Sequence, residues 1–353
     1  MIYPRFFRRS LRCVVWAVLC CGAVSFSIPI QSDTLPSRLG NDEFWSLIGS
    51  LSEAEGYFRS DNLVSNETGF QKAVEELLNR GATGGAYLGV GPEQNFSYIA
   101  ALKPRIAFIP DIRRGNLRLH LMYKALFELS EDRAGFLSRL FSRKRPGNVN
   151  AESTIRQLIA AFHDAELETE AGYSANLNAI LDILVEDRGF LLSREDVAGI
   201  GSMYRSFYSY GLEITYSSSQ SKGPYGNPTF ADLMTGGNES GEGSYLSSEE
   251  AFASVKDLEE RNLVVPVIAD FAGPNSIRAI GKYLREHNAA VSVFYVSNVE
   301  RYLDDVWGDF CKNVAALPLN EKSTFVRWTG NFKGGGHSFG SILEEIKPGL
   351  LPP

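Results

Sequence analysis

Two glycines and one aspartate are the residues of this chain whose spacing best suits ligand binding. Gly89 and Gly91 follow a short apolar run and precede a stretch with helical character. Glycines let the backbone turn sharply and lie close to a ligand. Asp111 ends the next apolar run, about 20 residues after Gly91, where an acid can accept the hydroxyl groups of a ribose. The stretch Gly85–Asp111 therefore predicts the strand, turn, helix and second strand of a Rossmann-like nucleotide-binding unit.

The composition of the turn narrows the class of nucleotide. A dinucleotide-binding turn carries a third glycine, and residues 93–95 read Glu-Gln-Asn in that region. This difference disfavours a pyrophosphate ligand such as NAD and favours a nucleoside such as S-adenosylmethionine. An ordinary strand–helix turn with no ligand is the alternative. The candidate cofactor-binding residues are Gly89, Gly91, Glu93, Asn95 and Asp111.

Three polar residues near this unit are candidates for catalysis. Asn66 and Glu67 close a segment rich in amides and acids, which can fold over a nucleotide and supply a general base. Asp270 follows a buried apolar run, so it stands at the end of another predicted strand. Each position also has a structural interpretation, because Asn66 can cap the helix predicted at Phe70 and Asp270 can cap the one at Ser276.

Composition and motif content exclude several classes of function. The 353 residues carry a net charge of −7 and no long basic run, which disfavours general nucleic-acid binding. The four histidines are scattered, so the sequence predicts no metal site. It also contains no Walker A motif.

The first residues differ from the rest of the chain. Residues 1–12 carry four arginines, and Cys13–Ser27 is free of charge and mostly apolar. This pattern predicts a signal peptide or a retained membrane anchor over residues 1–27. If this prediction holds, the protein is exported to the periplasm or associated with a membrane. If residues 1–27 are neither a signal peptide nor an anchor, the protein is expected in the cytoplasm. After cleavage Cys311 would be the one remaining cysteine, which leaves no intrachain disulfide.

Alternation of apolar runs and amphipathic stretches indicates one α/β domain over residues 43–329, after a linker at 28–42. The predicted fold is a doubly wound, mostly parallel sheet of the Rossmann type, whose ligands bind where the strand order reverses. We expect strands at 86–90, 105–110, 263–269, 290–296 and 323–328. We further expect a helical insertion at 130–200, a flexible loop at 217–245, a helix at 299–307 and a Gly/Pro-rich tail at 330–353 that includes His337.

Four segments resemble an uncharacterised bacterial family with a class I S-adenosylmethionine-dependent methyltransferase-like core. The resemblance covers residues from about Phe44 to Trp328. It implies the Rossmann-like fold of methyltransferases and an S-adenosylmethionine site at Gly89, Gly91 and Asp111, and it brings no known substrate. The segments are Gly56–Glu67, Tyr87–Phe96, Ile109–Arg114 and Phe294–Glu300.

The sequence thus predicts a methyltransferase whose acceptor is a small molecule or a peptide. Catalysis would rest mostly on positioning, with Asp270, Asn66 or Glu67 orienting the acceptor. One alternative is a non-catalytic, exported protein that binds a nucleotide or small ligand with a degenerate Rossmann core. Another is an NAD-type oxidoreductase, which the missing third glycine disfavours.

Overall fold

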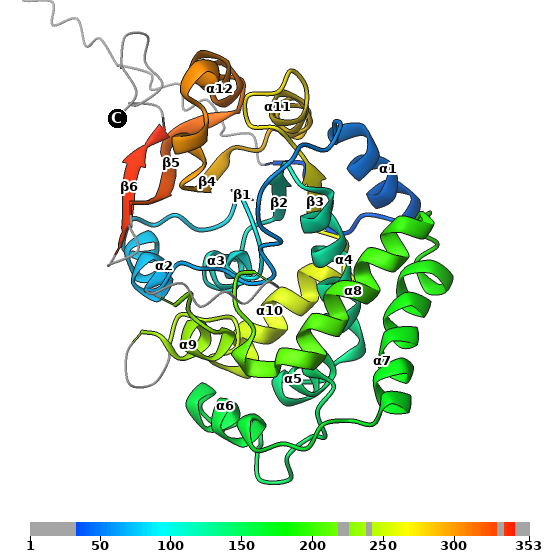
Figure 1. The fold of residues 1–353 in the computed structure, drawn as a ribbon. Helices are drawn as coiled ribbons and strands as arrows, with labels where there is room; N and C mark the ends of the chain where they lie inside the picture. Colours follow the sequence, from blue (N-terminus) through cyan, green and yellow to red (C-terminus); the bar gives the residue numbers. More distant parts are fainter. Residues whose placement is uncertain (1–32, 218–225, 238–241, 330–334, 343–353) are drawn as a thin grey trace, which may run out of the picture. The chain divides into compact units, whose positions relative to one another are not determined.

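A single sheet of six strands forms the centre of the protein (Figure 1). The computed structural model describes residues 33–217, 226–237, 242–329 and 335–342. The predicted signal peptide or anchor, residues 1–27, lies outside the described residues. The strands are β1 (Ala86–Gly89), β2 (Ile106–Asp111), β3 (Val264–Ile268), β4 (Val291–Ser297), β5 (Leu319–Trp328) and β6 (His337–Ser341).

The strand order is β3-β2-β1-β4-β5-β6, and every neighbouring pair is parallel except β5 and β6. Leu88 of β1 is level with Phe108 of β2 on one side and with Phe294 of β4 on the other. The chain therefore winds from β1 outward through β2 and β3, and then returns to add β4 on the opposite side of β1. This confirms the predicted α/β architecture with a mostly parallel sheet. The strand order reverses between β1 and β4, where ligands of open α/β sheets bind.

Helices cover both faces of the sheet (Figure 1). One face carries α1 (Asn41–Leu51), α11 (Ser276–Glu286) and α12 (Trp307–Ala315). The other carries α2 (Phe70–Asn79), α3 (Gln94–Leu102), α4 (Arg114–Leu129) and α10 (Glu249–Glu260). The β1, β2 and β3 strands are buried along their whole lengths, as expected for parallel strands with helices on both faces.

The described residues between α4 and α10 form a series of helices and turns. Thr154 and Ser193 each begin a helix with a side chain that accepts a backbone N–H bond, a favourable N-cap. The expected loop at 217–245 includes a short helix, and its residues 218–225 and 238–241 lie outside the described part. The helices are α5 (Arg133–Phe141), α6 (Ile155–His163), α7 (Glu170–Asp182), a π-helical turn (Ile183–Asp187), α8 (Arg194–Tyr210), a 3-10 turn (Gly211–Glu213) and α9 (Phe230–Thr235).

Two elements differ from the sequence-based expectation. The helix expected at 299–307 is two 3-10 turns, Val299–Tyr302 and Asp304–Val306, and α12 begins only at Trp307. Aspartates compete with helical hydrogen bonding and favour such turns. The tail contributes β6, which pairs antiparallel with β5, the strand before it in the sequence. The pattern of β6 is weak in the sequence because strand formation depends on such packing. None of the helices in the described ranges is long and apolar enough to cross a membrane.

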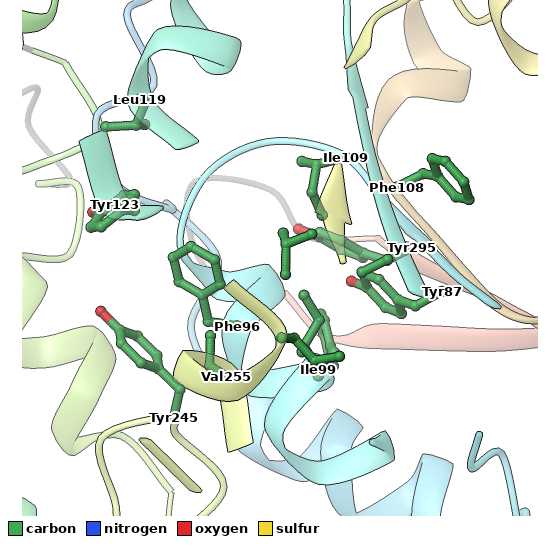
Figure 2. Packing of buried hydrophobic residues seen from close by; sticks show 14 of the residues in the cluster. Tyr87, Phe96, Ile99, Phe108, Ile109, Leu119, Tyr123, Tyr245, Val255 and Tyr295 are labelled. Carbon is green, nitrogen blue, oxygen red and sulfur yellow. The ribbon is translucent and has the colours of Figure 1, made fainter. Parts of the chain in front are cut away.

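One phenylalanine connects the glycine turn to the helical layer. Phe96 of α3 is fully buried and meets four aromatic rings edge to face, with centroid distances of 5.2–5.5 Å. Three of the rings belong to α4 (His120, Tyr123 and Phe127), and the fourth is Tyr245. Figure 2 shows Tyr123 and Tyr245 beside Phe96. Each such pair contributes about 0.5–1.5 kcal/mol beyond area burial, so α4 is held firmly against the start of α3.

Candidate functional site

One loop, residues 52–69, runs along the carboxyl ends of the central strands; we call it the crossing loop. At its start the Glu53 N–H donates to the Ile268 carbonyl at the end of β3, at 3.0 Å. Further along, the Gly56 N–H donates to the Ile112 carbonyl just after β2, at 2.9 Å. Backbone hydrogen bonds therefore fix the first half of the loop to the edge of the sheet where the candidate ligand site lies.

The second half of the crossing loop contacts the β1 turn and β4. The Ser65 N–H lies 3.1 Å from each carboxyl oxygen of Glu93, and the Ser65 hydroxyl donates to Oε1 of Gln94 at 2.5 Å. Two residues later, Glu67 accepts a hydrogen bond from the hydroxyl of Ser297, the last residue of β4. The crossing loop thus spans the point where the strand order reverses.

Glu67 lies at the centre of a buried polar cluster. Its Oε2 atom lies 3.1 Å from Nε2 of His337 and accepts from Nε2 of Gln94 at 3.3 Å. The Glu67 and His337 side chains are only 2% and 3% exposed. Burial is the main cause that raises the pKa of Tyr98 and Tyr295, and the negative charge of Glu67 is the second. The Glu67 cluster is our name for Glu67 and its neighbours Gln94, Tyr98, Tyr295, Ser297 and His337. Figure 2 shows Tyr295 beside Tyr87.

Ser297 adopts an uncommon backbone conformation within this cluster. Its φ is +54°, in the left-handed region that non-glycine residues rarely occupy. Its hydroxyl donates to Glu67, and its side chain is half-buried. Residues in sparsely populated conformations concentrate at functional sites, because the surrounding structure must hold them there. The backbone conformation of Ser297 is therefore a second indication, beside the polar contacts, that the end of β4 belongs to a functional site.

The two glycines of the β1 turn have different roles. A Cβ at Gly89 would lie 2.0 Å from Oδ1 of Asn95 and 2.4 Å from the Tyr87 hydroxyl, which hydrogen-bond to each other at 2.8 Å. The Asn95 amide also donates to the carbonyls of residues 90–92 at 2.8–3.1 Å. Gly91 has φ +84°, and a Cβ added there would have no heavy atom within 4 Å. The side chain of Asn95 thus holds the turn from within, and Gly91 leaves the backbone open to close approach.

Glu93 and His120 flank the turn as buried groups. Burial raises the pKa of Glu93 to about 8, so its carboxyl group holds a proton at neutral pH. Burial also lowers the pKa of His120 to about 4, which keeps the imidazole neutral. The His120 Nε2 atom lies 2.9 Å from the Gly91 carbonyl oxygen. The turn therefore has neutral groups on both sides.

Asp111 lies at the carboxyl end of β2, next to the β1 turn. The backbone N–H and Nε of Arg113 donate to its Oδ1 at 2.9 and 3.0 Å, and Nη2 donates to Oδ2 at 2.7 Å. The side chains of this ion pair are 5% and 9% exposed. Arg113 also donates to the carbonyl of Asp61 in the crossing loop. A carboxylate has about four acceptor positions, so one position on Oδ2 is left for a further donor.

The structure brings most of the predicted site residues to one edge of the sheet. Glu67 joins the turn residues Gly89–Asn95 and Asp111 there, while Asn66 faces solvent. Asp270 follows β3, the edge strand, where its Oδ1 accepts the Ala272 N–H at 2.9 Å. Three strand spacings of about 4.8 Å separate β3 from β4, so Asp270 is not brought together with Glu67.

Sequence-based prediction does not identify His337, Ser297 and Gln94 as site residues. Gln94 lies inside the turn, and Ser297 directly follows a predicted strand, so both have a positional signal. His337 has none, because the β5–β6 pairing brings it to Glu67 from 270 positions away in sequence. Among the residues that the structure describes, no group of three or more His, Cys, Asp or Glu side chains could hold a metal ion.

A comparison with protein families identifies residues 62–341 as a domain of unknown function, DUF7790. That match covers most of the 353 residues. The chain belongs to the DUF7790 family. The DUF7790 domain begins in the crossing loop and ends with β6, so Glu67, Asp111 and His337 all fall inside it. The family description names no activity, and no curated protein matches the chain.

Proposed function

We propose that this DUF7790 protein is an S-adenosylmethionine-dependent methyltransferase. The nucleoside would bind at the carboxyl ends of β1 and β2, and the methyl acceptor would bind at the end of β4. The observation that carries the proposal is the arrangement about the reversal in strand order. Gly91 and Asp111 lie on one side of it, and the Glu67 cluster lies on the other.

The residues present fit the nucleoside part of this cofactor. The open side of Gly91 allows the backbone to approach a ligand closely. The remaining acceptor position of Asp111 suits a ribose hydroxyl, and Arg113 holds the carboxylate in place to receive it. No basic side chain is needed at the turn, because the ligand lacks a pyrophosphate. When bound, S-adenosylmethionine supplies an electrophilic methyl group.

Glu67 would act on the acceptor. An acceptor hydroxyl or amine loses a proton as its oxygen or nitrogen forms the new bond to carbon, and a positioned carboxylate can take that proton. Ser297 holds one oxygen of Glu67, and Gln94 and His337 hold the other, so the carboxylate is fixed in orientation. Such fixed geometry is what catalysis by positioning requires.

Isothermal titration with S-adenosylmethionine, S-adenosylhomocysteine and NAD tests the proposal. We expect micromolar binding of the first two and at least tenfold weaker binding of NAD, because the turn lacks a third glycine. Asp111→Ala should weaken S-adenosylhomocysteine binding at least tenfold, since it removes the ribose acceptor. Asp270→Ala, which changes another acid after a strand, is the matched control and should leave the affinity within twofold.

Two outcomes of this titration would reject the proposal. If none of the three ligands binds, the protein is not a methyltransferase of this kind. If NAD binds more tightly than S-adenosylhomocysteine, the oxidoreductase interpretation replaces it.

A non-catalytic binding protein is the second candidate. Arg113 favours it, because its backbone N–H and guanidinium together occupy three acceptor positions of Asp111, and a rigid site suits retention of a ligand more than turnover. Incubation with methyl-labelled S-adenosylmethionine and cell extract distinguishes the two candidates. A methyltransferase transfers label to an acceptor, and a binding protein does not.

A further inference from the structure

One face of α4 carries His120, which contacts the glycine turn, and Asn116. The His120 Nε2 atom lies 2.9 Å from the Gly91 carbonyl oxygen, which fixes the direction of this face. Asn116 lies four residues earlier, one helical turn closer to the end of β2, so the two side chains share the face. Asn116 is 1% exposed and His120 is 2% exposed. Both are therefore buried beside the candidate nucleoside site.

These side chains have polar atoms without partners. Both amide atoms of Asn116 and the Nδ1 atom of His120 make no hydrogen bond within the described part of the chain. The same holds for the buried Oδ1 of Asn62, which follows the residue of the crossing loop whose carbonyl binds Arg113. A buried polar group without a partner destabilises the folded state. Three such residues beside one ion pair therefore call for a ligand that satisfies them.

A second buried asparagine shows what a purely structural role looks like. Asn313 of α12 is 0% exposed and uses both ends of its amide. Its Oδ1 accepts from Nε of Arg278 at 2.6 Å, and its Nδ2 donates to the carbonyls of Phe271 and Gly273 at 2.9 and 2.7 Å. Asn116 is also a helical asparagine and nearly as buried, but its amide makes none of these contacts.

The unpartnered atoms define the chemistry of the missing partner. With the neutral His120 donating from Nε2 to Gly91, its Nδ1 is an acceptor that needs a donor. Oδ1 of Asn62 also needs a donor, and the amide of Asn116 offers N–H donors at Nδ2 and an acceptor at Oδ1. A phosphate brings acceptors almost exclusively, whereas hydroxyl groups and the edge of a nucleobase bring both kinds of group.

We infer that Asn62, Asn116 and His120 bind the sugar hydroxyls and base edge of a nucleoside, next to Asp111. This inference rests on the proposed function and extends it, because it names the residues that select a nucleoside over a phosphate-bearing ligand. A bidentate amide contact of the Asn116 type is a common way to recognise adenine. Asp111 would supply the charge, and these three residues would supply the directional contacts.

The test compares Asn116→Leu with Asn313→Leu in the full-length protein. Leucine at 116 removes an unsatisfied amide, so the melting temperature of the ligand-free protein should rise by about 2 °C or more. Leucine at 313 removes three hydrogen bonds and should lower the melting temperature. Asn116→Leu should also weaken binding of S-adenosylhomocysteine and adenosine at least tenfold, and Asn313→Leu should leave it within twofold. Asn116→Ala, which adds no bulk, should weaken binding to the same extent.

Failure of the proposed function and failure of this inference give different results. If the wild-type protein binds neither probe, the proposed function fails, and the melting temperatures alone decide the inference. A higher melting temperature for Asn116→Leu then supports a site kept for a ligand with hydrogen-bond donors. The inference is overturned if both Asn116 variants lose as much thermal stability as Asn313→Leu, or if they bind a nucleoside as tightly as the wild type.

Discussion

Replacing Glu67 by alanine should lower the free energy of unfolding by about 3–5 kcal/mol, the usual cost of removing one partner from a buried charged network. The substitution leaves the Ser297 hydroxyl, the Gln94 amide and the His337 imidazole without their common partner. Gln94 is buried at the edge of the sheet and Ser297 is half-buried there, so solvent replaces the lost hydrogen bonds only in part. Urea denaturation at neutral pH, followed by circular dichroism, measures the change.

The neighbouring residue provides the control for this prediction. Asn66 faces solvent, so Asn66→Ala should change the free energy of unfolding by less than about 0.5 kcal/mol. The capping role considered for Asn66 is wrong, because the N-cap of α2 is Gly69 and no side chain caps that helix. The two substitutions therefore compare a buried side chain with an exposed neighbour in the same loop. A loss below about 1 kcal/mol for Glu67→Ala would show that the Glu67 cluster does not hold the crossing loop.

Gly89→Ala should destabilise the protein by about 3 kcal/mol, through overpacking and the loss of a buried hydrogen bond. The new Cβ would lie 2.0 Å from Asn95 Oδ1 and 2.4 Å from the Tyr87 hydroxyl. Both side chains are fully buried, and Asn95 also holds the carbonyls of the turn. The turn and the first strand must shift together to admit one methyl group.

Gly91→Ala is the matched variant. It should lower the free energy of unfolding less than Gly89→Ala does, and it should weaken ligand binding. Nothing lies within 4 Å of its Cβ position, so the cost is the left-handed backbone alone, roughly 1–2 kcal/mol. Its methyl group would lie on the open side of the turn, and nucleoside binding should therefore fall at least tenfold. Chemical denaturation and titration with S-adenosylhomocysteine measure both quantities. Equal destabilisation by the two variants would contradict the different roles that the geometry gives them.

The strands and helices of this fold can be predicted from the sequence, and the order of the strands in the sheet cannot. Alternating apolar runs predict β1, β2 and the α/β class because each strand and helix leaves its own periodicity. Gly91 and Asp111 are recognisable because their spacing reflects one strand–helix–strand unit. The order of the strands leaves no such trace, so Asp270 could not be recognised as following an edge strand far from Glu67.

The identity of the polar partners is the part that sequence could not supply. Asn95 and Glu93 are candidates for ligand contact from the sequence alone, and the structure shows their polar atoms bonded to the turn and to the crossing loop. Asn116 is one polar residue near a helix start in the sequence, and its lack of partners is visible only in three dimensions. His337 reaches Glu67 through the β5–β6 pairing, which depends on tertiary contacts.

Nucleoside binding at the carboxyl ends of β1 and β2, beside the point where the strand order reverses, underlies both the proposed function and the role inferred for Asn116. A crystal structure of the protein with S-adenosylhomocysteine decides whether it occurs. We expect the ribose against Asp111, the backbone of Gly91 within contact distance of the ligand, and the amide of Asn116 hydrogen-bonded to it. A ligand bound elsewhere on the protein, or a site at Gly91 and Asp111 that stays empty at saturating concentration, would contradict it.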